Sequence, residues 1–77
     1  MEFDVTGRGF RIVIFSDRYG NECSIQESSL ATEACIWLGC DDHRMHLTQG
    51  MAAQLIPHLQ HFVATGELPA PAQAEQA

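Results

Sequence analysis

Cysteine and histidine, the side chains that most often bind zinc, are concentrated in the middle of this chain. The four residues concerned lie within twelve positions and are Cys35, Cys40, His43 and His46. Two thiolates and two imidazoles can hold zinc tetrahedrally, but zinc-binding turns usually present two ligands two to four residues apart within one tight turn. The strand pairing expected below places Cys35 and His46 away from the loop tip, so we predict no metal site.

Two further patterns suggest chemistry at first sight. His58 and His61 are three residues apart on an expected helix, a spacing that can bring both imidazoles to one ion, yet no acid or thiol nearby in sequence completes the site. A cysteine beside a histidine can act as a nucleophile, but a chain of 77 residues has little room for a substrate pocket of several hundred Å³. We therefore predict a protein that is not an enzyme, with no catalytic residue, no metal and no cofactor.

The first element that could position such residues is a β-hairpin. Residues 10–17 are rich in β-branched and aromatic side chains, and turn-forming residues follow them. Beyond the turn, Cys23 and Ile25 alternate with polar residues, as in a half-exposed strand. We expect Ile14 to lie opposite Ile25, with residues 18–21 as the loop.

A second hairpin is expected from residues 34–38 and 44–47. Pairing Leu38 with Met45 collects the apolar side chains of both strands on one face and leaves residues 40–43 as the loop. A shift by one residue would place polar side chains beside apolar ones, so we reject it.

A helix should follow from Thr48, whose hydroxyl can accept hydrogen bonds from the first turn. Pro57 lies in its middle, on the solvent side, which predicts one kinked helix, with two short helices as the alternative. Gly66 provides a C-terminal stop. The apolar side chains share an arc of about 140° that should cover the sheet: Met51, Ala52, Leu55, Ile56, Leu59, Phe62 and Val63.

These elements predict an α+β fold: a small antiparallel β-sheet of about four strands in two hairpins, with one kinked C-terminal α-helix on one face. Residues 1–66 form the single domain. Residues 67–77 contain two prolines and mostly small or polar side chains, and should form a flexible tail. Whether residues 1–10 add a further strand stays open.

The charge balance excludes several partners. Ten acids against four arginines and no lysine give a formal charge of −6, which argues against direct binding to nucleic acid or to an anionic membrane. No apolar run approaches the roughly 18 residues of a membrane helix, and the acidic start does not resemble a secretory signal. Three cysteines without short paired spacing favour free thiols. We expect a cytoplasmic protein.

Trp37 is expected on the sheet face opposite the helix. Val13 and Phe15 should lie on the same side. Such a cluster needs a cover or a partner, since exposed aromatic and apolar patches mark interaction sites. The N-terminal segment with Phe3 and Val5 could fold over it, or a second copy could pair with it as a homodimer.

The chain also resembles a family of small, uncharacterised proteins of tailed bacteriophages and prophages. The resemblance rests on the runs FSDRYGNECSIQESSLATEACIWLG and RMHLTQGMAAQLIPHLQHFVATGEL and covers residues 14–68. The longer start, residues 1–10, departs from the family pattern. Small acidic phage proteins are often inhibitors of host defence, so the resemblance implies a function of the anti-CRISPR type in the bacterial cytoplasm.

We therefore expect a non-enzymatic inhibitor that binds a host protein complex at its basic nucleic-acid groove. Carboxylates spaced on a rigid sheet can replace phosphates opposite arginine and lysine. The alternative is a phage structural or assembly accessory protein that acts through a homodimer or another protein interface. The expected partner-binding residues are Asp17, Glu22, Glu27, Glu33, Asp41, Asp42 and Trp37.

Overall fold

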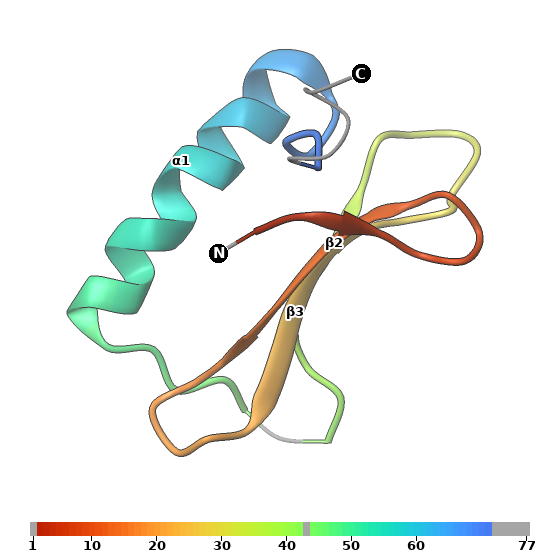
Figure 1. Cartoon of the computed structure of the whole chain (residues 1–77). Helices are drawn as coiled ribbons and strands as arrows, with labels where there is room; N and C mark the ends of the chain where they lie inside the picture. The colour runs from red at the N-terminus through yellow and green to blue at the C-terminus, as the bar shows by residue number, and fades with distance from the viewer. Residues whose placement is uncertain (1, 43, 72–77) are drawn as a thin grey trace.

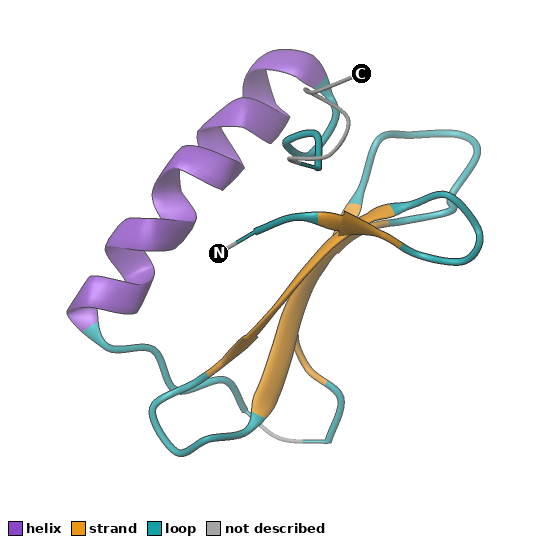
Figure 2. Ribbon diagram, in the orientation of Figure 1, coloured by secondary structure: helices purple, strands orange, loops and turns teal. Residues whose placement is uncertain are grey.

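The computed structural model describes residues 2–42 and 44–71 and consists of a meander sheet covered by a helix (Figure 1). The sheet has the order β1-β2-β3-β4, and each strand is antiparallel to its neighbours. Helix α1 lies along one face of the sheet (Figure 2). The predicted α+β class, with four strands and one C-terminal helix, is confirmed. The elements are β1 (Asp4–Val5), β2 (Arg11–Ser16), β3 (Glu22–Glu27), β4 (Ile36–Cys40) and α1 (Gln49–Thr65).

The first hairpin forms, but its register differs by one residue from the prediction. Val13, not Ile14, lies opposite Ile25, and Ile14 lies opposite Ser24. The difference arises at the turn, where the Asp17 N–H donates to the Asn21 carbonyl, so the loop closed by this pair, residues 18–20, ends one residue earlier than expected. A shift of one residue exchanges the two faces of a strand. Val13 is therefore buried and Ile14 is 57% exposed, and the predicted place of Val13 beside Trp37 is wrong.

The second predicted hairpin does not form. β4 pairs with β3, with Leu38 opposite Ile25, and residues 44–47 are not a strand. They pass the β2–β3 turn instead, where the Arg18 N–H donates to the His46 carbonyl at 2.8 Å. Pairing with β3 makes that strand central and hydrogen-bonded on both sides, which satisfies more backbone groups than an isolated second hairpin would.

Helix α1 has the predicted ends. The Thr48 hydroxyl accepts from the Met51 N–H at 3.2 Å. Gly66 adopts the left-handed conformation, with φ 75°, and its N–H donates to the Phe62 carbonyl. A residue with a Cβ would be strained at this φ, so glycine is suited to the position. The helix is continuous through Pro57, and the kink predicted there stays a prediction.

The core lies between α1 and the sheet and is built from segments that are far apart in the sequence. Its buried side chains are Phe3, Val13, Ile25, Leu55 and Leu68. The N-terminal segment therefore contributes to the core on the helix side through Phe3, while the short strand β1 extends the sheet at its β2 edge. It does not fold over Trp37, as one alternative had proposed.

The domain extends beyond residue 66. Leu68 is fully buried, its N–H donates to Glu27 Oε2, and its carbonyl accepts from Arg11 Nη1. Sequence composition could not show this, because one leucine among prolines and alanines looks like a linker. The first residues of the predicted tail thus belong to the fold, and residues 72–77 lie outside the described residues.

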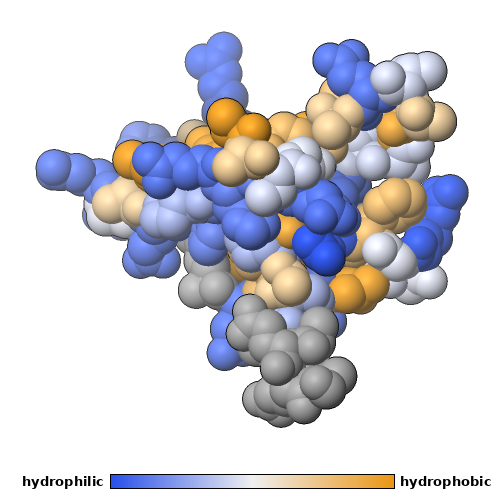
Figure 3. Space-filling model, turned by 90° about the horizontal axis from the view of Figure 1, so that it is seen from above, coloured by the Kyte–Doolittle hydropathy of each residue, from blue (hydrophilic) through white to orange (hydrophobic). Residues whose placement is uncertain are grey.

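Not all apolar side chains of α1 reach the core. Leu55 is buried, whereas Ile56 is 52% and Val63 is 84% exposed, so the predicted arc is wider than the surface that the sheet covers. Seen from above, hydrophobic side chains emerge at several places between hydrophilic ones (Figure 3). In the part of the chain that the structure describes, no helix is both long and apolar enough to cross a membrane.

Candidate binding surface

Asp17 was expected to contact a partner, but its carboxylate is buried inside the molecule. It accepts hydrogen bonds from the backbone N–H groups of Tyr19, Asn21 and His46, at 2.9, 3.0 and 3.0 Å, and from the Asn21 side chain. The bond from His46, assisted by the others, lowers the pKa of Asp17 from 3.8 to about 2 despite the opposing effect of burial. Asp17 therefore ties the β2–β3 turn to the segment before α1, and we remove it from the candidate surface.

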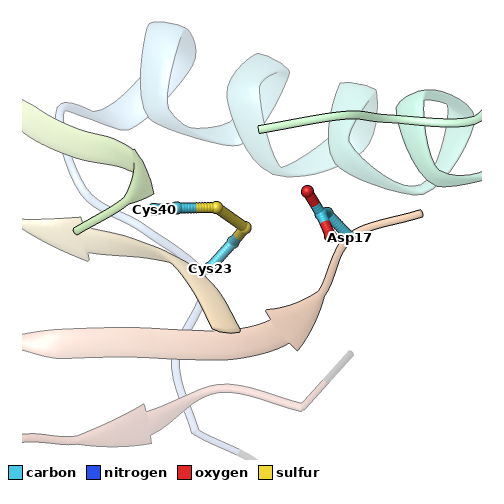
Figure 4. A group of neighbouring side chains, drawn as sticks. All are labelled: Asp17, Cys23 and Cys40. Atoms are coloured by element: carbon cyan, nitrogen blue, oxygen red, sulfur yellow. A yellow bond between two sulfur atoms is a disulfide. The ribbon is translucent and has the colours of Figure 1, made fainter. Parts of the chain in front are cut away.

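Cys23 and Cys40 form a disulfide next to Asp17 (Figure 4). The prediction of free thiols is therefore wrong for this pair, while Cys35 is free. The two cysteines lie directly opposite each other on β3 and β4, with 4.2 Å between their Cα atoms. Opposed residues of a non-hydrogen-bonded antiparallel pair come this close. The sequence could not reveal the pair because the β3–β4 pairing was not predicted.

The possible metal ligands are used in other ways. One potential ligand atom each from Asp17, Cys23 and Cys40 lies within 4.8 Å of the others. The two sulfurs are bonded to each other, however, and the carboxylate already accepts four hydrogen bonds. In this form the group offers no thiolate, which is the form of cysteine that binds metals. Cys40 is also lost from the cluster considered with Cys35, and His43 of that cluster lies outside the described residues.

The two helix histidines have different surroundings. The His58 ring packs edge-on against the Phe3 ring, with 4.9 Å between the ring centroids, whereas His61 is exposed. Burial lowers the pKa of His58 below its usual value of 6.5, because desolvation disfavours the charged imidazolium. The geometry therefore gives His58 a packing role in the middle of α1, against Phe3.

Four of the six predicted acids remain available on the surface. Glu27 is occupied, because its carboxylate accepts from the Arg11 and Leu68 N–H groups at 2.8 and 3.1 Å. It links β2 and the segment after α1, and we remove it from the candidate surface with Asp17. Those that stay exposed are Glu22, Glu33, Asp41 and Asp42.

The sheet face turned away from α1 has no cover in the part of the chain that the structure describes. Trp37 is 67% exposed on this face, in line with Gln26 of β3 and Ile12 of β2. Val13 and Phe15, which were expected beside it, lie on the opposite face. We call this surface the open face. Its strand residues, from β2 to β4, are Ile12, Ile14, Ser16, Glu22, Ser24, Gln26, Trp37 and Gly39.

A hollow of about 320 Å³ lies on the open face beside the indole. Trp37, Ser24, Gly39 and Asp41 are among its lining residues. Gly39 opposes Ser24 with φ 144° and has no side chain, and a Cβ placed there would meet no atom within 4 Å. The missing side chain therefore leaves space between Trp37 and Asp41.

A second hollow adjoins the first, and a second carboxylate, that of Glu22, lines it. Ile14, Glu22 and Asp41 are among its lining residues, so Asp41 contributes to both hollows. Sequence reasoning missed the part played by Ile14 because the predicted register placed it on the buried face, and no sequence signal marks Gly39 as the origin of a hollow.

The arrangement has the two groups that can bind a cationic side chain, an exposed indole and carboxylates. An arginine guanidinium stacks on an exposed indole and donates parallel hydrogen bonds to a carboxylate. The strand positions of the open face carry no arginine, although Arg8, in the loop between β1 and β2, lines a further hollow together with Trp37. Arg11, on the other face of β2, is held by the Leu68 carbonyl. The open face therefore combines an apolar centre with an acidic margin.

Comparisons with protein-family models, with curated proteins and with solved structures give no match to this chain. The chemistry of the open face is therefore the basis on which a function can be argued.

Proposed function

We propose that this protein is a non-enzymatic, phage-encoded inhibitor that binds a basic nucleic-acid groove of a host defence complex, as anti-CRISPR proteins do. The observation that carries the proposal is that Trp37 and Asp41 line one hollow on the sheet face that α1 leaves uncovered. The inhibitor acts in the bacterial cytoplasm and binds neither nucleic acid nor membrane itself.

Binding begins with long-range attraction, because a chain of charge −6 is drawn to a cationic groove. An arginine of the groove then stacks on Trp37 and bonds to Asp41, and further cations reach Glu22 and Asp42. The strand pairs of β2, β3 and β4 hold these groups at fixed spacing. Because these carboxylates are already held in place, little conformational entropy is lost on binding. This helps the protein to compete with a flexible nucleic-acid strand for the cations of the groove.

The first test measures how well the protein displaces target nucleic acid from a purified CRISPR effector complex, read by electrophoretic mobility shift. Replacing Asp41 and Asp42 together by Asn should weaken inhibition about tenfold or more and flatten its salt dependence, because two charge-assisted contacts are lost. Full inhibition by this double variant contradicts the proposal.

Single variants provide the matched control. Asp41→Asn and Glu67→Gln each remove one negative charge, but Glu67 lies just after α1 rather than on the open face. Asp41→Asn should weaken inhibition several-fold, and Glu67→Gln should leave it within about twofold. Equal effects would show that net charge, not the hollow beside Trp37, determines binding.

A phage structural or assembly accessory protein that acts through a homodimer is the second candidate. The amount of exposed apolar surface favours it, with Ile14, Trp37 and Val63 each more than half exposed. Fractionation of infected cells separates the two functions. An assembly protein co-sediments with virions or capsid intermediates, whereas the proposed inhibitor co-purifies with the defence complex.

A further inference from the structure

Helix α1 carries two apolar stripes, of which the sheet covers one. At 3.6 residues per turn, each stripe occupies an arc of about 60°, and their centres are about 100° apart. The first faces the core and consists of Met51, Leu55, His58 and Phe62. The second, which we call the outer stripe, consists of Ala52, Ile56, Leu59 and Val63.

The outer stripe is accessible along much of the helix. Val63 is 84% and Ile56 is 52% exposed. Together with Leu59, Gln60 and Ala64 these residues line a shallow apolar depression. A patch of this kind on a small protein marks a contact surface.

The spacing of the outer stripe fits another helix. Its members follow one another at intervals of four, three and four residues. This alternation is the one that keeps a seam of side chains facing a second helix in a coiled coil. A flat sheet or an extended peptide would not require it.

The charge distribution indicates which helix fits. The chain has ten acidic residues and four arginines, but α1 contains none of them. The exposed positions flanking the outer stripe are also neutral: Gln49, Ala53, Gln60 and Ala64. Two copies of an acidic protein can therefore meet along α1 without bringing carboxylates together.

The open face lacks this property. A two-fold contact there would place Glu22 and Asp41 of one copy near the same residues of the other, since the two share a hollow on that face. Like charges brought together in this way oppose association.

We propose that a second copy of this chain docks on the outer stripe, so that the protein forms a symmetric dimer through α1–α1 contact. In a two-fold dimer the same patch serves both subunits, and a neutral, self-complementary stripe meets that requirement. The dimer leaves both open faces free and rests on neither of the functions proposed above.

The contact is small, so the dimer is weak. A helix of 17 residues is about 25 Å long, and four side chains bury less than the roughly 800 Å² per partner of a standard interface. The dimer should form at about 100 μM protein and dissociate on dilution to about 1 μM.

Sedimentation equilibrium over that concentration range tests the proposal. Val63→Glu should raise the dimer dissociation constant at least tenfold, because it places two carboxylates in an apolar seam. Gln54→Glu adds the same charge at an exposed position almost opposite the outer stripe and should change the constant less than twofold. Val63→Ser adds no charge and should weaken the dimer less than Val63→Glu does. If the glutamate variant does not fold, the dissociation constant of the Val63→Ser dimer tests the proposal instead.

Trp37→Ala completes the set, because it alters the open face and leaves α1 intact. The full chain should still dimerise with this substitution. A wild-type chain that stays monomeric over the whole range overturns the proposal. A dimer that Trp37→Ala breaks and the Val63 variants preserve also overturns it.

Discussion

The open face and the outer stripe of α1 are both exposed and apolar, but they differ in charge. Carboxylates of Glu22 and Asp41 reach the hollows beside Trp37 and Ile14, whereas α1 carries no charged residue of the Asp, Glu, Lys or Arg type. Apolar area supplies affinity in both places, and charge determines the partner. The first surface suits a cationic partner and the second suits a copy of itself.

This difference in charge also explains how one small acidic chain could present two surfaces that bind different partners. Self-association through the open face is opposed by like charges, and a basic partner gains no ion pair from α1. A dimer through α1 would carry two open faces, and two linked sites bind a repetitive target more tightly than one. We therefore expect substitutions on one surface to leave binding at the other surface intact. Only residues that support both surfaces should affect both kinds of binding.

Asp17 is such a shared group, and its loss should have the largest effect. Its carboxylate holds the β2–β3 turn, next to the open face, and the His46 N–H just before α1. Asp17→Ala leaves three backbone donors without this acceptor. It should destabilise the fold more than the other substitutions described here and impair both dimerisation and partner binding.

Acid titration checks the same group, and comparing the wild type with Asp17→Asn cancels the protonation of the surface carboxylates that both chains share. Because folding lowers the pKa of Asp17 from 3.8 to about 2, its stabilisation is complete above pH 3.8 and is lost as the pH falls towards 2. The stability gap between the wild type and Asp17→Asn, measured by urea unfolding, should therefore narrow over this interval. A gap that is constant from pH 6 to 2 would contradict the role assigned to the carboxylate.

The Cys23–Cys40 disulfide should affect stability far more than binding, although Cys40 and Cys23 each line one of the two hollows of the open face. The two cysteines are 17 residues apart, and closing a loop of that length contributes about 3 kcal/mol in the chain-entropy account. The double variant Cys23→Ala, Cys40→Ala should therefore lose about that much free energy of unfolding, measured by urea denaturation. The β3–β4 register also rests on five residue pairs, and Trp37 should therefore keep its place. Inhibition and dimerisation, compared among folded molecules, should change less than about twofold.

The disulfide separates the two regions in one further way. A reducing cytoplasm keeps such pairs as thiols, so the proposed inhibitor must act without the bond. If reductant abolishes binding to the defence complex while the α1 dimer persists, the proposal of a cytoplasmic inhibitor fails and the dimer stands.

Local sequence signals predicted the helix with its ends and the β2–β3 hairpin, but not the register of that hairpin or the pairing of β4 with β3. Thr48 and Gly66 act within one turn of the chain, so their roles could be predicted from their types. Register and strand order depend on contacts far apart in sequence, such as the bond from the Arg18 N–H to the His46 carbonyl. The error in register also made part of the predicted binding surface wrong. The sequence-based register gives Trp37 the correct face and Ile14 the wrong one, and sequence alone predicts Asp17 as an exposed acid.

The acids show the same limit. Composition predicted an acidic surface, and Glu22, Asp41 and Asp42 are indeed exposed. Asp17 and Glu27 look no different in sequence, yet both accept backbone hydrogen bonds from distant segments. Sequence alone could not distinguish a structural carboxylate from a binding one, because the difference lies in donors 29 and 41 residues away.

His58 should give the smallest effect, and one confined to α1. Its ring packs on Phe3 and burial lowers its pKa below 6.5, so the neutral form is favoured in the folded state. The stabilisation is complete above pH 6.5 and decreases as the pH falls below that value, because the unfolded chain then binds the proton more readily. His58→Phe should remove this dependence between about pH 7 and 5, measured by thermal unfolding, while His61→Phe, at an exposed position, should retain it.

His58 lies on the core stripe of α1. Its protonation as the pH falls should therefore weaken the dimer slightly, and it should affect binding at the open face only at a lower pH. Equal pH dependence in the two variants would show that the effect arises outside α1.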